Sequence, residues 1–277
     1  MRAAARIVAE ADGRGGTRLP VLRGEPPLLL RRTGPARGPA TVHLVGGAAG
    51  PLSGDDLRLD VEVGPGARLD VRAVAATLAL PGRPAAPPSV FEVRASVAAR
   101  ATLCWLPEPL IAAAGCDHRA VARVEVADGG CLLWRDDLAC GRHGEPTGDL
   151  HADVTIRYAG ATLYRHQLAV GARAPGWSGA AVLGAATLGG SGTAARCGSP
   201  GDGHAMGSVV LARPDPPATH RAAADFPGVG QPRAEAAVMA LAGPGVLATA
   251  IGPDIRSVRA ALDPWCAAQL RDLEEFG

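Results

Sequence analysis

The sequence predicts a mainly β fold: an elongated, β-helix-like stack of β-hairpin layers, with two or three short α-helices near the C-terminal part. Three observations support this fold class. Strands show alternating apolar and polar residues, glycine-rich turns separate them, and the strand–turn–strand pattern recurs along the chain. With 277 residues, 47% of them apolar, the chain can bury a large core, and we expect a single β-rich domain over residues 1–277.

The clearest strand–turn–strand unit lies between residues 56 and 73. In Asp56–Val63, leucines and valines alternate with charged residues, which is the period-two pattern of a half-buried strand. Gly64-Pro65-Gly66 follows and reverses the chain, because proline fixes φ and glycine tolerates positive φ. Alternation resumes in Arg68–Ala73, so we expect the two strands to form a hairpin.

The same pattern returns in residues 94–107 and 123–136, and a looser fourth copy is expected in residues 154–168, with its turn at Ala159-Gly160. The intervals are 34 and 29 residues, inside the range of roughly 20 to 50 residues that stacked repeats use. An ordinary large β-sandwich is the alternative. When the copies are aligned, Val63, Val97 and Val126 precede the turn. Leu69, Leu103 and Leu132 follow it, and Val71, Trp105 and Trp134 lie two residues further on.

The organisation changes after about Pro175, and we expect residues 176–277 to be a weaker, loop- and helix-containing part of the domain. Glycine, serine and proline predict a loop at Cys197–Gly203, and an alanine-rich run predicts a short helix at Ala218–Ala224. Two strands are expected at Ala236–Ala242 and Val246–Ile251, joined by a hairpin turn.

The C-terminus reads as an amphipathic helix that packs on the core of its own chain. Asp254 is the expected N-cap. Asp263 followed by Pro264 has the form of a second N-cap and first helical position, so we expect a second helix to begin there.

Several catalytic signatures are missing, and we predict that the chain is not an enzyme. All 28 basic residues are arginine, which excludes a P-loop lysine and a Schiff-base amine. Gly243–Ala248 fits G-x-G-x-x-A, but a strand pattern follows it where a dinucleotide site needs a helix. A β-solenoid hydrolase acting on carbohydrate is the enzymatic alternative, although 3% aromatic residues offer little sugar-stacking surface. A plain structural oligomer is the third alternative.

Charge and hydropathy exclude some classes of binding partner. The formal net charge of +1 and the few aromatic residues argue against nucleic-acid binding. The sequence contains no apolar stretch of membrane-spanning length, and the N-terminal residues do not form a secretory signal. We therefore expect a cytoplasmic protein with no membrane partner, whose cysteines stay reduced.

The six cysteines include no C-x-x-C pair, so buried structural thiols are the ordinary expectation. Two pairs are candidate nickel or zinc ligands, because sulfur and imidazole nitrogen suit these metals. They are Cys116 with His118, and Cys140 with His143.

A polar run in Leu133–Glu145 supplies the candidate functional residues. Asp136 and Asp137 are neighbours that should point to opposite faces of a strand, so they do not form an acid–base pair. Together with Arg142 and Glu145 they are candidates for lining a wet passage or a partner contact, because carboxylates can pass a hydrated divalent cation that a thiolate would hold. A solvated loop is the alternative.

Six segments, in this order and spacing, resemble those of the urease accessory protein family UreD, also called UreH. The resemblance is good from about Arg6 to Tyr164 and weaker beyond. The segments are Pro27–Arg32 (PLLLRR), Thr41–Val45 (TVHLV), Gly50–Leu57 (GPLSGDDL), Ala75–Thr77 (AAT), Trp105–Glu108 (WLPE) and Leu133–Glu145 (LWRDDLACGRHGE).

The resemblance implies a cytoplasmic, non-catalytic scaffold that binds apo-urease together with UreF and the GTPase UreG, and helps deliver nickel to the urease active site. It implies no tightly bound cofactor, only transient passage of nickel. The chain departs from the family pattern near Val74–Leu80, where Val74 replaces a common glutamine and Leu78-Ala79 replace a lysine and an aromatic residue. We expect partner contacts in that segment to differ accordingly.

Overall fold

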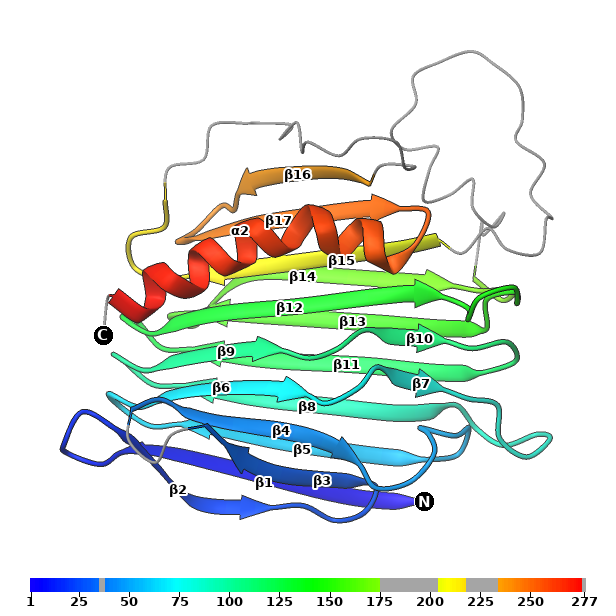
Figure 1. Cartoon of the computed structure of the whole chain (residues 1–277), viewed down its shortest axis with the longest axis horizontal. Coiled ribbons are helices and arrows are strands. Elements are labelled where there is room, and N and C mark those ends of the chain that lie inside the picture. The colour runs from blue at the N-terminus through cyan, green and yellow to red at the C-terminus, as the bar shows by residue number, and fades with distance from the viewer. Residues whose placement is uncertain (35–37, 175–203, 218–233, 276–277) are drawn as a thin grey trace.

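A computed structural model describes residues 1–34, 38–174, 204–217 and 234–275 of the chain. The loop expected at Cys197–Gly203 and the short helix expected at Ala218–Ala224 lie outside these residues. Within them, strands stack in two facing sheets, and one long helix crosses the outer face of the second sheet (Figure 1).

Sheet A contains seven strands. In spatial order they are β14 (Ala161–Val170), β13 (Asp149–Tyr158), β11 (Asp117–Val126), β8 (Ser89–Val97), β5 (Asp56–Val63), β1 (Arg2–Ala11) and β2 (Thr17–Arg23).

Sheet B is larger and has two short strands beside its main path. In spatial order the main strands are β16 (Glu235–Ala240), β17 (Gly245–Gly252), β15 (His204–Ala212), β12 (Cys131–Cys140), β9 (Thr102–Leu106), β6 (Arg68–Ala73), β4 (Ala40–Gly46) and β3 (Leu28–Thr33); β7 (Thr77–Ala79) and β10 (Leu110–Ala112) complete the sheet.

The predicted stack is confirmed, and its register follows the aligned repeat positions. β5, β8 and β11 pair in parallel, and so do β6, β9 and β12. Each column of equivalent residues therefore runs straight through three layers. The columns are Val63, Val97 and Val126 in sheet A, and Leu69, Leu103, Leu132 with Val71, Trp105, Trp134 in sheet B.

The pairing inside a layer differs from the expected hairpin. The strands on either side of Gly64–Gly66, β5 and β6, lie in different sheets and do not pair with each other. Both strands bury one apolar face, so placing them in facing sheets brings the two faces together in one core. In the looser fourth copy, β13 and β14 do pair antiparallel around Ala159-Gly160, and β14 forms the edge of sheet A.

The strands expected in the C-terminal part are confirmed as the antiparallel pair β16 and β17. The helix α2 (Ile255–Glu275) follows, and Asp254 caps it by accepting a hydrogen bond from the Ser257 amide at 2.7 Å. The prediction of a second helix starting at Asp263 is wrong, because α2 continues through Pro264. Val258, Leu262 and other apolar residues of α2 pack on sheet B. These contacts lie on both sides of Pro264 and keep the helix continuous there.

Candidate functional site: a cavity between the two sheets

Two strands of sheet B are interrupted at neighbouring positions. β6 ends at Ala73 and its line resumes as β7 at Thr77, while β9 ends at Leu106 and resumes as β10 at Leu110. β10 then pairs with the second half of β12, next to Leu138. The two interruptions therefore lie side by side, opposite the Asp136-Asp137 segment of the unbroken strand β12.

A cavity of about 500 Å³ lies behind these interruptions, between the two sheets. Its walls are mainly apolar and come from both sheets, and its volume falls in the range of ligand-sized cavities. All six segments that resemble the UreD family contribute residues to its border. Segments that lie far apart in the sequence, from Pro27 to Leu138, thus build one site.

Asp136 is the central polar group of the cavity. It accepts a hydrogen bond from Trp134 Nε1 at 2.5 Å, and the indole of Trp134 stacks on Trp105 with ring centroids 4.9 Å apart. Burial raises the pKa of Asp136 to about 7, although the bond from Trp134 opposes the rise. The side chain therefore changes charge near neutral pH.

Other polar groups gather around Asp136 from both sheets. Ser208 on β15 is the register partner of Asp136, and Tyr164 and His166 come from β14 of sheet A. Burial, followed by the charge of Asp136, raises the pKa of Tyr164 to about 12, and burial lowers the pKa of His166. No sequence pattern marked these three residues, because they lie far from Asp136 along the chain.

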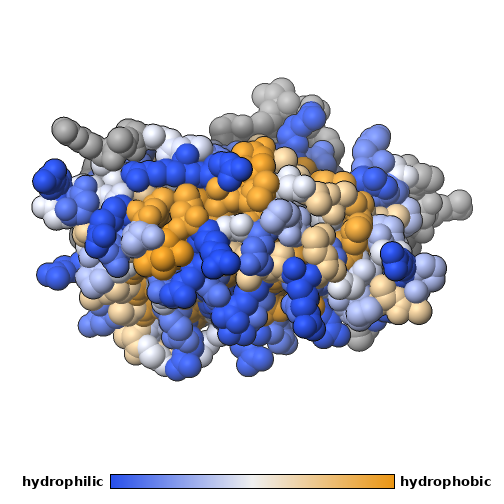
Figure 2. Space-filling view, turned by 90° about the horizontal axis from the view of Figure 1, so that it is seen from below, coloured by the Kyte–Doolittle hydropathy of each residue, from blue (hydrophilic) through white to orange (hydrophobic). Residues whose placement is uncertain are grey.

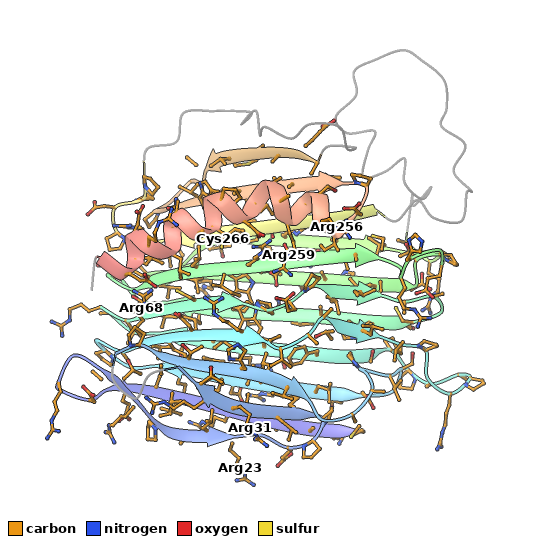
Figure 3. The ribbon with its side chains drawn as sticks, viewed as in Figure 1. Arg23, Arg31, Arg68, Arg256, Arg259 and Cys266 are labelled. Carbon is orange, nitrogen blue, oxygen red and sulfur yellow. The ribbon has the colours of Figure 1, made fainter. Side chains whose placement is uncertain are left out.

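Asp137 points to the other side of β12, toward α2, as expected for neighbours in a strand. Its carboxylate pairs with Arg135 at 2.8 Å, and Arg135 also binds Asp263 of α2 at 2.7 Å. Arg259 of α2 lies 3.9 Å from Asp137 and also pairs with Glu108 of the WLPE segment. Figure 3 shows Arg259 next to the helix, beside β12.

This ion-pair network ties α2 to the outer side of the cavity wall. Burial raises the pKa of Asp137, while the guanidinium of Arg135 lowers it. The sequence missed Arg259 and the partner role of Glu108, although the WLPE segment had marked Glu108 as part of a resemblance.

Arg142 and Glu145 lie apart from the cavity, in the loop after β12. The Arg142 guanidinium donates two hydrogen bonds to Glu145, at 2.8 and 2.7 Å, and the Arg142 amide donates a third at 2.9 Å. Glu145 also accepts one from the Ala114 amide. The bonds from Arg142 lower the pKa of Glu145 to about 2. β12 itself continues to Cys140, so Asp136 and Asp137 belong to a strand and not to a solvated loop.

The four candidate metal ligands do not form a cluster. Cys116 and Cys140 are buried in an apolar cluster, where burial raises the pKa of each thiol to about 12. His118 is buried and shares a hydrogen bond with Ser89 Oγ, and burial lowers the pKa of its imidazole to about 4. His143, in contrast, is exposed in a loop. Among the described residues, no three His, Cys, Asp or Glu side chains come close enough to hold a metal ion.

The fold and the site together define a two-sheet β stack with an apolar cavity between the sheets, which Asp136 borders and beside which Asp137 joins β12 to α2 through ion pairs. Within the described ranges, no helix has the length and apolar character needed to span a bilayer.

Comparison with known proteins gives the family. The sequence model of the family described as "UreD urease accessory protein" matches residues 1–275 of this chain. Urease accessory protein UreD 3 of Streptomyces griseus is 45% identical over 270 residues, covering 95% of each chain. Urease accessory protein UreD of Streptomyces coelicolor is 42% identical over 265 residues, covering 95% of this chain and 94% of the relative.

The chain therefore belongs to the UreD urease accessory protein family, and the suspected resemblance is confirmed. A role in urease maturation follows from this membership. The prediction of a non-catalytic protein is confirmed as well, because these relatives are accessory proteins.

Proposed function

We propose that this chain is a cytoplasmic scaffold of urease maturation, which binds apo-urease together with UreF and the GTPase UreG and helps deliver nickel to the urease active site. Nickel is its cargo and not a resident cofactor. The observation that carries the nickel part of the proposal is the cavity behind the interrupted strands, with Asp136 on its wall.

The chemistry of the cavity suits passage better than storage. Asp136 offers oxygen ligands, Ser208 and His166 also border the cavity, and none of the cysteines that the structure describes does. Oxygen groups exchange a hydrated divalent cation more readily than thiolates, which bind nickel strongly. Because the pKa of Asp136 is about 7, its carboxylate is charged in part of the molecules at neutral pH, and protonation would release a bound cation.

Arg142 and Glu145 have a different part in the proposal. They form an ion pair in the loop after β12, outside the cavity, with Arg142 about half exposed and Glu145 mostly covered, so we assign them to a partner contact and not to the passage. Asp137 borders the cavity but also balances Arg135, so its contribution to passage cannot be separated from its contribution to folding by an alanine variant.

The test is urease activation with purified UreF, UreG, apo-urease and nickel. Asp136→Asn keeps the shape of the side chain and removes its charge, and we expect it to lower urease nickel content and activity at least threefold while co-purification with UreF stays intact. Asp128→Asn is the matched control, since it makes the same change at an exposed aspartate in the turn after β11, outside the cavity, and it should not change nickel delivery. Full activation by Asp136→Asn would overturn the passage.

A further inference from the structure

Part of the cavity border on sheet B is apolar and exposed. Val74, in the interruption between β6 and β7, is 57% exposed and is one of few large apolar side chains so exposed in the described part of the chain. Ala48 and Ala49, in the loop after β4, and Ala75 are also exposed and border the cavity. These four exposed positions, the rim of the cavity, carry no charge, although 20% of the residues of the chain are charged.

A basic row lies beside this rim. Arg31, His43 and Arg72 are register partners across the adjacent strands β3, β4 and β6. They face outward, because Val42 and Val71, their neighbours along these strands, are buried in the core. Figure 3 shows Arg31 at the end of the stack that carries β2 and β3.

The arginines of this row lack carboxylate partners. Neither Arg31 nor Arg72 forms an ion pair with any described residue: Arg31 donates to the Leu30 carbonyl at 2.9 Å. Asp70 faces the same side, two residues before Arg72; it forms a 4.0 Å ion pair with Arg68, and the charge of Arg72 acts on it only at longer range. The row therefore keeps an excess of positive charge. Figure 2, which views this end of the stack, shows apolar groups in a band with hydrophilic side chains around it.

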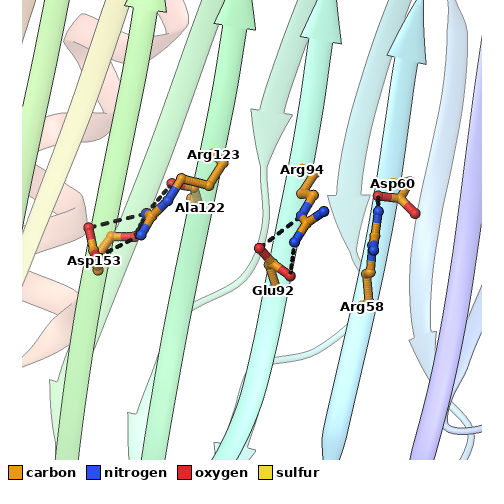
Figure 4. A network of polar contacts seen from close by, with 7 residues as sticks. All are labelled: Arg58, Asp60, Glu92, Arg94, Ala122, Arg123 and Asp153. Carbon is orange, nitrogen blue, oxygen red and sulfur yellow. Dashed lines mark hydrogen bonds and ion pairs between the residues drawn. The ribbon is translucent and has the colours of Figure 1, made fainter. Parts of the chain in front are cut away.

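The outer face of sheet A is different. Arg58 pairs with Asp60 at 2.7 Å, Arg94 with Glu92 at 2.8 Å, and Arg123 with Asp153 at 2.7 Å (Figure 4). These ion pairs balance charges on four neighbouring strands of that face, β5, β8, β11 and β13. The contrast places the excess positive charge of the β3–β4–β6 face next to the mouth of the cavity.

We propose that the cavity rim at Val74 and the basic row Arg31–His43–Arg72 together form a docking surface for a protein whose contact surface carries carboxylates beside an apolar, uncharged segment. Carboxylates would pair with the two arginines, and guanidinium–carboxylate pairs are often bidentate. The apolar segment would cover Val74 and the alanines without leaving a charge buried and unpaired.

The inference rests on the proposed function, which brings protein partners to this chain, and it adds where one of them binds. A partner seated on this surface would face the mouth of the cavity directly. The phosphates of a nucleic acid could also bind the arginines, but they would make no favourable contact with the apolar rim. The geometry therefore points to a protein.

The experiment measures binding of the purified chain to immobilised apo-urease and to immobilised UreF, each alone, at low and physiological salt. We expect Arg31→Glu with Arg72→Glu, and separately Val74→Asp, to weaken binding to the same one of these proteins at least tenfold. The arginine double variant should also reduce the salt dependence of that binding. Val74→Ser, which adds no charge, should weaken it less than Val74→Asp.

The matched control is Arg83→Glu with Arg119→Glu, which makes the same charge change at two exposed arginines away from the rim. It should bind like the wild type, and all variants should keep the wild-type melting temperature. Unchanged binding by both test variants would overturn the docking surface and leave the proposed function standing. Failure of the wild type to bind either protein would overturn the proposed function and the inference with it. Binding of DNA that is lost in the arginine double variant would overturn the assignment of a protein partner.

Discussion

Arg135 of β12 and Asp263 of α2 are joined by a 2.7 Å ion pair that spans 128 residues of sequence. Arg135 is buried and binds Asp137 as well, whereas Asp263 lies at the exposed rim of the helix. The residue that the sequence suggested as the cap of a second helix thus serves instead to fix the middle of one helix to the sheet.

The two carboxylates should contribute unequally to stability. Asp263→Ala leaves Arg135 with Asp137, and we expect a loss of about 1 kcal/mol or less in the free energy of unfolding, as for a partly exposed pair. Asp137→Ala removes the buried partner, and we expect a loss of about 3 kcal/mol. Denaturant midpoints of the two variants and the wild type measure both. Equal losses would show that the buried side of the network does not dominate.

Asp136 should make stability depend on pH. Burial raises its pKa from 3.8 to about 7 in the folded chain, so the folded state holds a proton that the unfolded state has released. The stability that this group contributes is therefore fully present below about pH 4 and is lost as the pH rises to about 7. Above that pH the loss is complete and constant.

The variant Asp136→Asn isolates this effect, since it cannot ionise and can still accept the bond from Trp134. We expect its melting temperature, relative to the wild type, to be higher at pH 8 than at pH 5. Thermal unfolding followed by circular dichroism across this range gives the comparison. A difference that stays constant with pH would mean that Asp136 keeps an ordinary pKa in the folded chain.

The repeat columns could be predicted from the sequence, because stacking places equivalent residues on top of each other and selects similar side chains. Val63, Val97 and Val126 illustrate this, since each occupies the same place in its layer. What the sequence could not predict is whether the two strands of a layer pair with each other or face each other. Both arrangements need the same alternation and the same glycine-rich turn.

The site was predictable only in part. Asp136 and Asp137 stood out as adjacent acidic residues in an apolar strand, and the structure places both on the border of the cavity. The cavity itself could not be foreseen, because it depends on two strand interruptions, after Ala73 and after Leu106, that line up only in the folded stack. The local sequence can indicate where a strand is interrupted, but it does not show which other strand interruption lies next to it in the fold.

The end of α2 depends on an arginine from the sheet. Arg68 of β6 donates a 2.6 Å hydrogen bond to the Leu273 carbonyl, one of the last carbonyls of the helix, which have no partner within it. Figure 3 shows Arg68 beneath the C-terminal end of α2. Replacement by methionine keeps most of the side-chain length and removes the donor.

We expect Arg68→Met to fray the last turn of α2 without unfolding the stack. Hydrogen exchange of amides near Leu273 should become at least tenfold faster, while amides in the first turns of α2 and in β12 keep their rates. Arg256→Met is the control, because Arg256 is exposed and lies in the first turn of the same helix. Faster exchange along the whole helix would mean that Arg68 supports docking of α2 and not its end.

Gly207 of β15 marks the closest approach of helix and sheet. A Cβ atom at this position would lie 2.7 Å from Leu262 Cδ1 and 2.8 Å from Val258 Cγ1, both on α2, and 2.6 Å from Asp137 Oδ1. These distances are shorter than contacts between real side chains, so Gly207→Ala must push α2 outward or displace Asp137. We expect a loss of about 1 to 3 kcal/mol in the free energy of unfolding, typical of an overpacked core.

Gly46→Ala is the matched control for this prediction. Its added Cβ would have no neighbour closer than the Ala48 carbonyl oxygen at 3.8 Å, which is an ordinary contact, so its denaturant midpoint should stay close to that of the wild type. In Gly207→Ala, hydrogen exchange should quicken in α2 more than in the column of Leu69, Leu103 and Leu132, because the helix can yield while the stacked strands cannot. If the denaturant midpoint of Gly207→Ala equals that of the wild type, α2 lies far enough from β15 to accept a methyl group, and the prediction is wrong.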